Sequence, residues 1–192
     1  MHIAEVRGMS LSARIWPRAV EELRPDEVWD KTCFYSSPIR KPGTDVRQHA
    51  DAFLNALVEP AIEQLDGSMR VVRADHLSSS PVTGSVFEHV VRSGLLIADL
   101  SYHNASVLHE VGLRHGSGKP CVLISRLEDE IPANLREVRT VLVKTETFWD
   151  FYAEFEVKRR EIAEYARWAL SADAAASNPV QRLFPDYRKY FR

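Results

Sequence analysis

The sequence lacks the features that would place it in a membrane, in secretion or on nucleic acid. No apolar run approaches the roughly 20 residues that a membrane-spanning helix needs. The first residues, interrupted by Glu5 and Arg7, lack the apolar core of a signal peptide. The net charge of −2 over 192 residues gives no reason to expect nucleic acid or an anionic membrane as a partner. These absences predict a cytoplasmic protein with one globular domain and added terminal segments.

Cofactor and metal signatures are missing as well. There is no Gly-rich dinucleotide fingerprint and no P-loop, because the segment 116–119 (Gly-Ser-Gly-Lys) follows a predicted helix and does not open one. His103, His109 and His115 do not have the spacing of a zinc motif, and no third-ligand pattern accompanies them. The two cysteines lie in predicted buried strands, as core thiols of a cytosolic protein do. We therefore expect no cofactor, no metal and no disulfide.

Short apolar runs alternate with amphipathic stretches along the middle of the chain. The runs predict five strands, at 32–37, 69–74, 95–98, 121–125 and 140–144. Helices are expected over 45–65 with a kink at Pro60, over 83–93, from Asn104 or Ser106 to 116, and over 148–170. This alternation predicts an α/β fold, a three-layer sandwich with a doubly wound parallel sheet in the flavodoxin-like order 2-1-3-4-5.

Two terminal segments flank this predicted domain. Residues 1–31 form an N-terminal leader, 32–170 the α/β domain, and 171–192 a linker followed by a helix or arm. The expected helix 148–170 is aromatic on one face, and the tail is aromatic too. These aromatic side chains are expected either to form a self-association surface, making the protein a homo-oligomer, or to cover the outer face of the sheet.

Polar side chains follow three of the predicted strands. Because the carboxyl ends of parallel strands lie along one edge of a sheet, where ligands bind, these side chains are expected to converge. They are Tyr35, Ser36, Ser37 and Arg40 after the first strand, Asp75 after the second, and Asp99, Asn104, Ser106 and Glu110 around the third. Hydroxyls, an arginine and a free helix N-terminus suit a phosphate, and two carboxylates suit a ribose and its anomeric carbon.

Glu110 lies near the expected start of the helix that begins at Asn104 or Ser106. The helix macrodipole is expected to favour its ionised form, which can stabilise an oxocarbenium-like centre or attack it. Each residue also has a structural alternative. Glu110 can pair with Arg114 on an exposed helix face, Asp99 can cap the following helix, and Arg40 can be a solvated surface residue.

The central segment resembles the nucleoside 2-deoxyribosyltransferase-like superfamily, which is related in fold to TIR domains. The resemblance covers 32–125 and is strongest in Ile-Ala-Asp-Leu at 97–100, Asn104, Val-Leu-His-Glu-Val-Gly at 107–112 and Gly-Lys-Pro at 118–120. The loop 35–40 (Tyr-Ser-Ser-Pro-Ile-Arg) resembles the phosphate-binding loop of the nucleotide N-glycosidase branch. The departures are His109, where an aromatic residue is usual, and Val111 in place of Leu or Ile.

The resemblance implies cleavage or exchange of an N-glycosidic bond. Glu110 would be its catalytic carboxylate and Asp99 a ribose or base contact. Asn104 would be a phosphate or sugar ligand, and Ser37 and Arg40 would hold phosphate.

Three functions are compatible with these residues. The first is a TIR-like NAD⁺ glycohydrolase, of the sort bacteria use in antiphage defence, with NAD⁺ as substrate. The second is a nucleoside 5′-monophosphate N-glycosidase or deoxyribosyltransferase, and the third is a non-catalytic nucleotide-binding module. Nicotinamide leaves from a cationic ring without needing a proton, whereas a neutral base needs an acid. His103, His109 and Tyr35 are candidates for that acid, but no sequence pattern identifies one of them as a dedicated proton donor. The sequence therefore favours NAD⁺ as the substrate.

Overall fold

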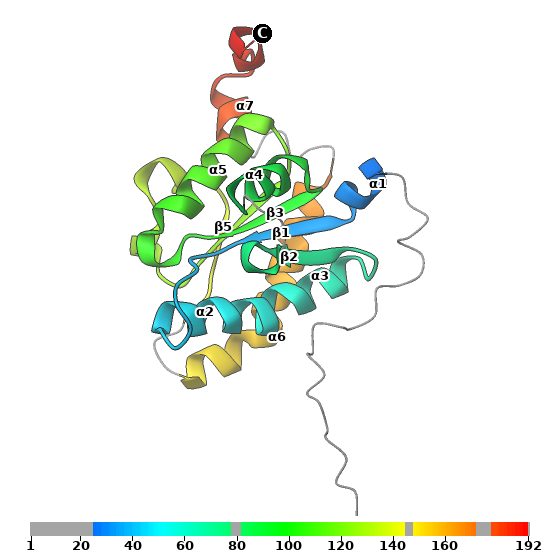
Figure 1. Cartoon of the computed structure of the whole chain (residues 1–192). Coiled ribbons are helices and arrows are strands. Elements are labelled where there is room, and N and C mark those ends of the chain that lie inside the picture. The colour runs from blue at the N-terminus through cyan, green and yellow to red at the C-terminus, as the bar shows by residue number, and fades with distance from the viewer. Residues whose placement is uncertain (1–24, 78–81, 145–147, 172–177, 192) are drawn as a thin grey trace, which may run out of the picture.

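The structure is a computed structural model that describes residues 25–77, 82–144, 148–171 and 178–191. Residues 1–24 of the predicted leader and 172–177 of the predicted linker lie outside this description. At its centre is a fully parallel sheet with the order β2-β1-β3-β4-β5 (Figure 1). The strands are β1 (Thr32–Ser36), β2 (Arg70–Arg73), β3 (Leu95–Asp99), β4 (Cys121–Ser125) and β5 (Thr140–Leu142). The predicted fold class and strand order are confirmed.

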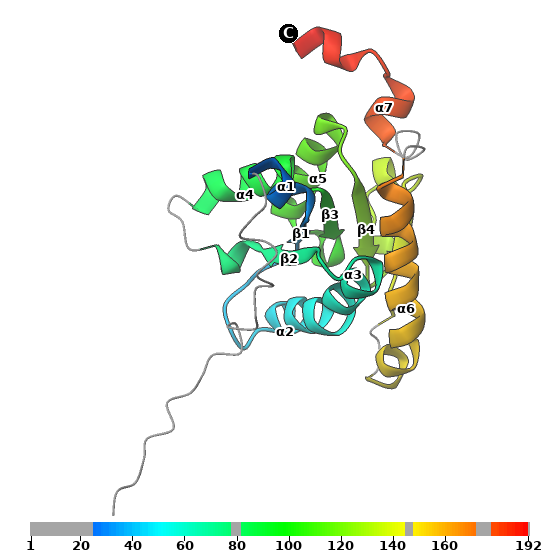
Figure 2. The ribbon, with the colours of Figure 1, turned by 90° about the vertical axis from the view of Figure 1, so that its right-hand side faces the viewer.

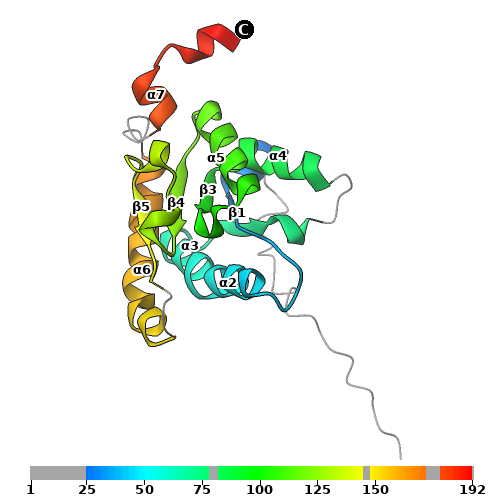
Figure 3. The ribbon, with the colours of Figure 1, turned by 90° about the vertical axis from the view of Figure 1, so that its left-hand side faces the viewer.

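Helices cover both faces of the sheet, as Figures 2 and 3 show from opposite sides. One face carries α2 (Asp45–Phe53), α3 (Glu59–Leu65) and α6 (Phe148–Ala169), and the other carries α4 (Val82–Arg92) and α5 (Ala105–Ser117). Two short helices, α1 (Pro25–Asp30) and α7 (Pro179–Leu183), lie before β1 and after α6. Within the described ranges, no helix combines the length and apolar character needed to cross a bilayer.

Successive side chains of a strand point to opposite faces of the sheet. Because helices cover both faces, the strands are buried on both sides. In β1, Tyr35 packs toward α2, α3 and α6, whereas Phe34 packs toward α4 and α5. β3 alternates in the same way, with Ile97 on the first side and Ala98 on the second. Tyr165 of α6 packs against the first of these two clusters. Covering the sheet was one of the two roles predicted for the aromatic side chains of this helix.

The helix predicted over 45–65 is divided near its proline. A π-helical turn over Leu54–Val58 separates α2 from α3. Pro60 has no N–H, so the carbonyl oxygen of Ala56 lacks the usual donor four residues further on. The Nε of Arg159 in α6 donates to that oxygen instead, at 2.7 Å. A π-helical turn therefore precedes the proline, and α6 satisfies the freed carbonyl.

Both terminal segments are hydrogen-bonded to the α/β domain. The backbone N–H of Gly94, just before β3, donates to the carbonyl oxygen of Trp29 in α1 at 2.7 Å. A Cβ on Gly94 would lie 2.3 Å from the carbonyl oxygen of Asp30, so this close approach requires glycine. At the other end, Tyr187 Oη donates to the carbonyl oxygen of Gly116 in α5 at 2.5 Å.

His115, buried in the last turn of α5, should make stability depend on pH. Burial, and then repulsion from Arg114, lowers its pKa from 6.5 to about 4. Between these values the unfolded chain binds a proton that the folded chain does not. Stability should therefore fall as the pH drops through this window, by up to about 3 kcal/mol. Urea unfolding between pH 7 and pH 4 measures the effect. His115→Gln should flatten the dependence, and an unchanged slope in that variant would assign it to other groups.

Candidate functional site

The carboxyl ends of β1 and β3 lie side by side where the topology of the sheet reverses. Ser36 of β1 is paired with Ala98 of β3. From β1 the chain passes to α2 on one face, and from β3 it passes to α5 on the other. Ligands of open α/β sheets bind in the crevice outside such a switch point. The candidate side chains that the sequence placed after the first and third strands should therefore meet at this edge.

Glu110 reaches the edge from α5. The helix begins at Asn104, whose Oδ1 accepts hydrogen bonds from the backbone N–H groups of Ser106 and Val107, which confirms the predicted N-cap. This start places Glu110 in the second turn, where its Oε2 accepts a hydrogen bond from Ser36 Oγ at 2.5 Å. The predicted meeting of these two candidate side chains is confirmed.

Arg114 does not pair with Glu110. Its side chain is fully buried, and its guanidinium donates to the backbone carbonyl oxygens of Val90, Gly94 and Pro120 at 2.8, 3.1 and 3.0 Å. These bonds connect α5 to the end of α4 and to the starts of β3 and β4. The structural alternative, an exposed pair between Glu110 and Arg114, is therefore wrong.

The pKa of Glu110 shifts in the opposite direction to the one expected. Burial raises the pKa of its carboxyl above the usual 4.5, and the hydrogen bond from Ser36 and the nearby His109 offset this only in part. The macrodipole acts within the first turn of a helix, and Glu110 lies beyond it. Desolvation is thus the larger effect, and the predicted bias toward the ionised form is wrong. A partly buried carboxyl with a raised pKa is typical of a functional site.

Asp99 reaches the same edge from the opposite face of the sheet. Its side chain is fully buried, and Oδ1 accepts from the backbone N–H of Ser101 at 3.0 Å. Oδ2 accepts from Tyr35 Oη at 3.3 Å and lies 2.8 Å from Nε2 of His49 in α2. Burial, and then the charge of Asp99, raises the pKa of Tyr35 well above its usual value, so the phenol keeps the proton that it donates. Asp99 does not cap α5, because Asn104 does.

His49 was not among the residues predicted from the sequence. Its side chain is only 6% exposed, and its ring packs against Phe53, with 4.0 Å between the ring centroids. One signal was present in the sequence. His49 lies three residues after Val46 and four before Phe53, so it falls within the apolar stripe of α2. A polar residue in a buried stripe needs a partner, and the partner here is Asp99.

Asp75 lies just after β2, within a network of ion pairs. It contacts Arg47 at 2.8 Å and Arg73 at 2.7 Å, and Arg73 also contacts Asp51 at 2.6 Å. Burial alone would raise the pKa of Asp75, but the hydrogen bond and charge of Arg73, followed by the nearby His76 and Arg47, outweigh it and lower the pKa. Arg73, which the sequence did not single out, is buried beside Tyr35, its partner in the register.

The remaining predicted residues have unequal access to a ligand. Ser37 Oγ is buried and has no hydrogen-bond partner among the described residues. Arg40 is exposed in the loop after β1. The Oδ1 of Asn104 is occupied by the cap of α5, and Ser106 is exposed in the first turn of that helix. The serines at 78–80, close to Asp75 in the sequence, lie outside the described residues.

The loop after β3 is strained. Tyr102 and His103 have φ values of 64° and 48°, in the left-handed region that non-glycine residues rarely adopt. The guanidinium of Arg126 stacks on the Tyr102 ring at 4.0 Å and is itself paired with Glu130 at 2.8 Å. Such conformations persist only where the surroundings hold them, and they cluster at ligand sites.

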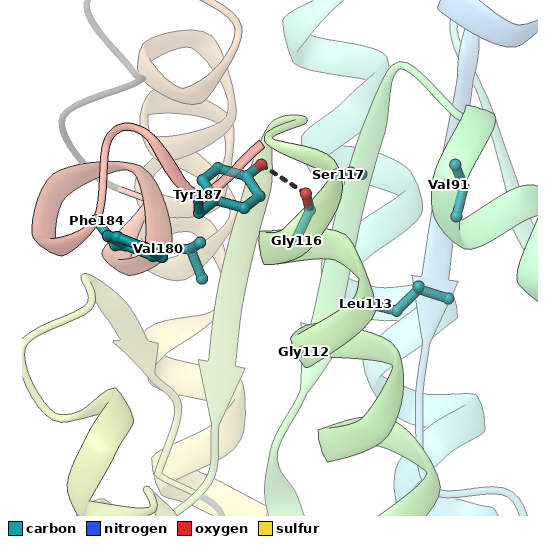
Figure 4. Close-up of a pocket in the computed structure, with 8 residues that line it drawn as sticks. All are labelled: Val91, Gly112, Leu113, Gly116, Ser117, Val180, Phe184 and Tyr187. Carbon is teal, nitrogen blue, oxygen red and sulfur yellow. Dashed lines mark hydrogen bonds between the residues drawn. The ribbon is translucent and has the colours of Figure 1, made fainter. Parts of the chain in front are cut away.

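A separate apolar cavity of about 750 Å³ lies beside the C-terminal half of α5 (Figure 4). Its walls include Leu113 of α5, Val91 of α4, and Phe184 and Tyr187 of the C-terminal arm. None of the predicted site residues lines it. In the described parts of the chain, no three His, Cys, Asp or Glu side chains are grouped so that they could hold a metal ion.

Comparison with known proteins adds no assignment to this site. No family model matches the chain, and no curated protein matches it. The likeness to the deoxyribosyltransferase-like superfamily therefore rests on the residues and motifs quoted above. The function has to be argued from the arrangement of Glu110, Asp99 and their partners.

Proposed function

We propose that the protein cleaves the N-glycosidic bond of a nucleotide, with Glu110 as the catalytic carboxylate. The observation that carries the proposal is the position of Glu110, a partly buried carboxyl bonded to Ser36 at the switch point of the sheet. A carboxylate there can stabilise positive charge at the anomeric carbon or attack it. Asp99, on the other side of the same edge, supplies the second carboxylate for a ribose hydroxyl or the base.

Two substrates are compatible with this chemistry. NAD⁺ is the first, in a TIR-like reaction of a cytoplasmic antiphage-defence enzyme, because its nicotinamide leaves without needing a proton. A nucleoside 5′-monophosphate is the second, and the loop after β1 favours it. There the buried Ser37 hydroxyl has no partner among the described residues, and three residues later Arg40 is exposed, with a guanidinium that can bind a phosphate. Transfer of the sugar to another base instead of water would use the same residues.

Incubation with NAD⁺ and a panel of nucleoside 5′-monophosphates, with the products identified by mass spectrometry, tests the proposal. Free nicotinamide or a free base, together with the matching ribosyl product, is the expected result. Saturable binding of a nucleotide without any product would contradict catalysis and support the non-catalytic binding module.

Replacing Arg40 by alanine should weaken binding of a phosphorylated substrate by about 1.5–3 kcal/mol, the range for a hydrogen bond to a charged group. Arg40 is exposed, and the described residues offer it no ion pair, so the fold should not depend on it. Titration calorimetry with a nucleoside 5′-monophosphate and with its dephosphorylated nucleoside measures the difference. Equal losses for both compounds would mean that Arg40 does not contact the phosphate.

A further inference from the structure

We propose that the apolar face formed by α5 and the C-terminal arm (residues 178–191) is the interface of a two-fold symmetric dimer of this chain. The partner is a second copy, and each copy places the projecting part of its arm in the groove beside α5 of the other. The inference is independent of the proposed function, because this groove lies along the second half of α5 and none of the candidate site residues lines it.

The concave part of the face is the cavity of about 750 Å³ in Figure 4, which is open to solvent on one side and is called the α5 groove below. Gly112 and Gly116, one turn apart on α5, are among its lining residues. A Cβ at either position would meet no atom within 4 Å. Glycine inside a helix costs about 1 kcal/mol relative to alanine, so the open space is obtained at the expense of helix stability. The α5 groove therefore has room for side chains from another molecule.

The walls of the α5 groove suit a protein partner better than a small polar ligand. None of the 8 residues that line it is charged. Its polar groups are bonded within the chain, since Tyr187 Oη donates to the carbonyl oxygen of Gly116 at 2.5 Å and Ser117 Oγ to that of Arg114 at 2.7 Å. Sites for small molecules present a few convergent polar groups that orient the ligand, whereas the centres of protein interfaces are apolar and depleted in charge.

The convex part of the face is the arm, which Figures 1 and 2 show beyond the end of the sheet. Three of its apolar residues are exposed, Leu183 at 74%, Tyr190 at 71% and Phe184 at 48%. With about 200 Å² for an aromatic side chain, the two rings alone leave roughly 240 Å² uncovered. Asn178 Nδ2 anchors the arm to α5 by donating to the carbonyl oxygen of His115 at 2.9 Å. The projection is therefore held in place before any partner binds, which lowers the entropic cost of association.

Phe87 extends the apolar face across α5 onto α4. It is 37% exposed, lies one turn before Val91 of the groove wall, and its ring meets that of His109 with 5.6 Å between centroids. A standard interface buries about 800 Å² on each partner and has an apolar centre. The α5 groove, the arm and Phe87 together supply such a centre, and exposed apolar faces of this extent mark interaction sites.

A second copy fits this face because one chain carries both halves of the contact. In an isologous interface the same surface of both subunits meets, so a projection that enters the partner's groove is matched by the reverse contact. The two halves adjoin, since Phe184 lines the α5 groove and Leu183 directly precedes it. The described charges beside the arm are paired in opposite signs, Arg182 with Glu137 at 2.7 Å and Lys189 with Asp186 at 2.9 Å. Two copies of these pairs meet without net repulsion, and each anion can face a cation of the other copy.

Sedimentation velocity over a range of protein concentrations tests the proposal, and the wild-type protein should sediment with the mass of two chains. Gly112→Leu fills the α5 groove without a clash at its Cβ, and Leu183→Glu places a charge on the projection. Each should raise the dissociation constant of the dimer at least about 30-fold, as loss of an interface hot spot does. Val157→Glu is the matched control, because Val157 is 55% exposed on α6, outside this face, and it should change the constant less than about threefold.

Mixing the two interface variants tests the symmetry of the contact. A dimer of either variant alone has both of its contacts damaged. A mixed dimer keeps one intact contact, because the projection of the Gly112→Leu chain can enter the α5 groove of the Leu183→Glu chain. The mixture should therefore associate more tightly than either variant by itself.

Circular dichroism confirms that each variant is folded. Wild-type protein that stays monomeric at every concentration would overturn the proposal and leave the α5 groove to another occupant, such as residues 1–24 of the same chain or a different protein. A dimer that neither variant weakens, or a mixture that associates no better than its components, would overturn it as well. None of these outcomes bears on glycosidic cleavage, which the substrate panel tests separately.

Discussion

Replacing Glu110 by glutamine should lower turnover about 100-fold or more, while the protein stays folded and still binds nucleotide. Glutamine has nearly the same size and keeps an oxygen that can accept the hydrogen bond from Ser36. What it removes is the negative charge that would face the positive charge developing at the anomeric carbon. Turnover measured by mass spectrometry and affinity measured by calorimetry separate the two effects.

The pH dependence of the wild-type reaction provides a second measurement on Glu110. The ionised form is required, and burial raises the pKa of the carboxyl above 4.5. Activity should therefore increase as the pH rises through a value above 4.5, and it should be lost on acidification before an ordinary glutamate would be protonated. Unchanged turnover in a folded Glu110→Gln variant would contradict the catalytic role of Glu110 and favour a non-catalytic nucleotide-binding module.

Replacing Arg114 by methionine should lower the free energy of unfolding by about 3–5 kcal/mol, as expected when the charged partner of a buried polar network is removed. Methionine fills part of the space but leaves the carbonyl oxygens of Val90, Gly94 and Pro120 without their donor. These carbonyls belong to segments that enter or leave the sheet next to the site. Urea denaturation, with the midpoint and slope compared between variant and wild type, measures the loss.

Arg182→Met is the matched control for this prediction. Arg182 pairs with Glu137 at 2.7 Å, but both side chains are largely exposed. Exposed pairs contribute little, so the control should lose less than about 1 kcal/mol. Similar losses at the two positions would mean that the buried hydrogen bonds of Arg114 do not stabilise the fold more than a surface pair does.

Local sequence patterns predicted the elements that form the site. The run Leu95–Ala98 is apolar without alternation, as a strand buried on both faces must be, and β3 covers it. Asn104 and Gly118 bound α5 because a side-chain acceptor suits a helix start and a left-handed glycine suits a helix end. With both elements in place, Glu110 was predicted at the edge of the sheet from residues within about one strand and one helix.

Long-range packing decided what the candidate residues contact. His49 and Asp99 are 50 residues apart and meet only because α2 folds over the end of β3. Arg114 looked like the surface partner of Glu110, yet its three acceptors come from other segments of the chain. No pattern of neighbouring residues encodes such contacts, since they depend on how separate elements pack.

The sequence by itself determined the parallel α/β sheet, its strand order and the edge at which Glu110 and Asp99 lie, because apolar periodicity and helix caps act over a few residues. Only the tertiary structure decided the hydrogen-bond partners of those carboxylates and the direction in which the pKa of Glu110 shifts. The macrodipole is a local effect that the sequence reveals, whereas the larger effect on Glu110 is burial. Desolvation depends on every segment that packs around a group, so it exists only once the chain is folded.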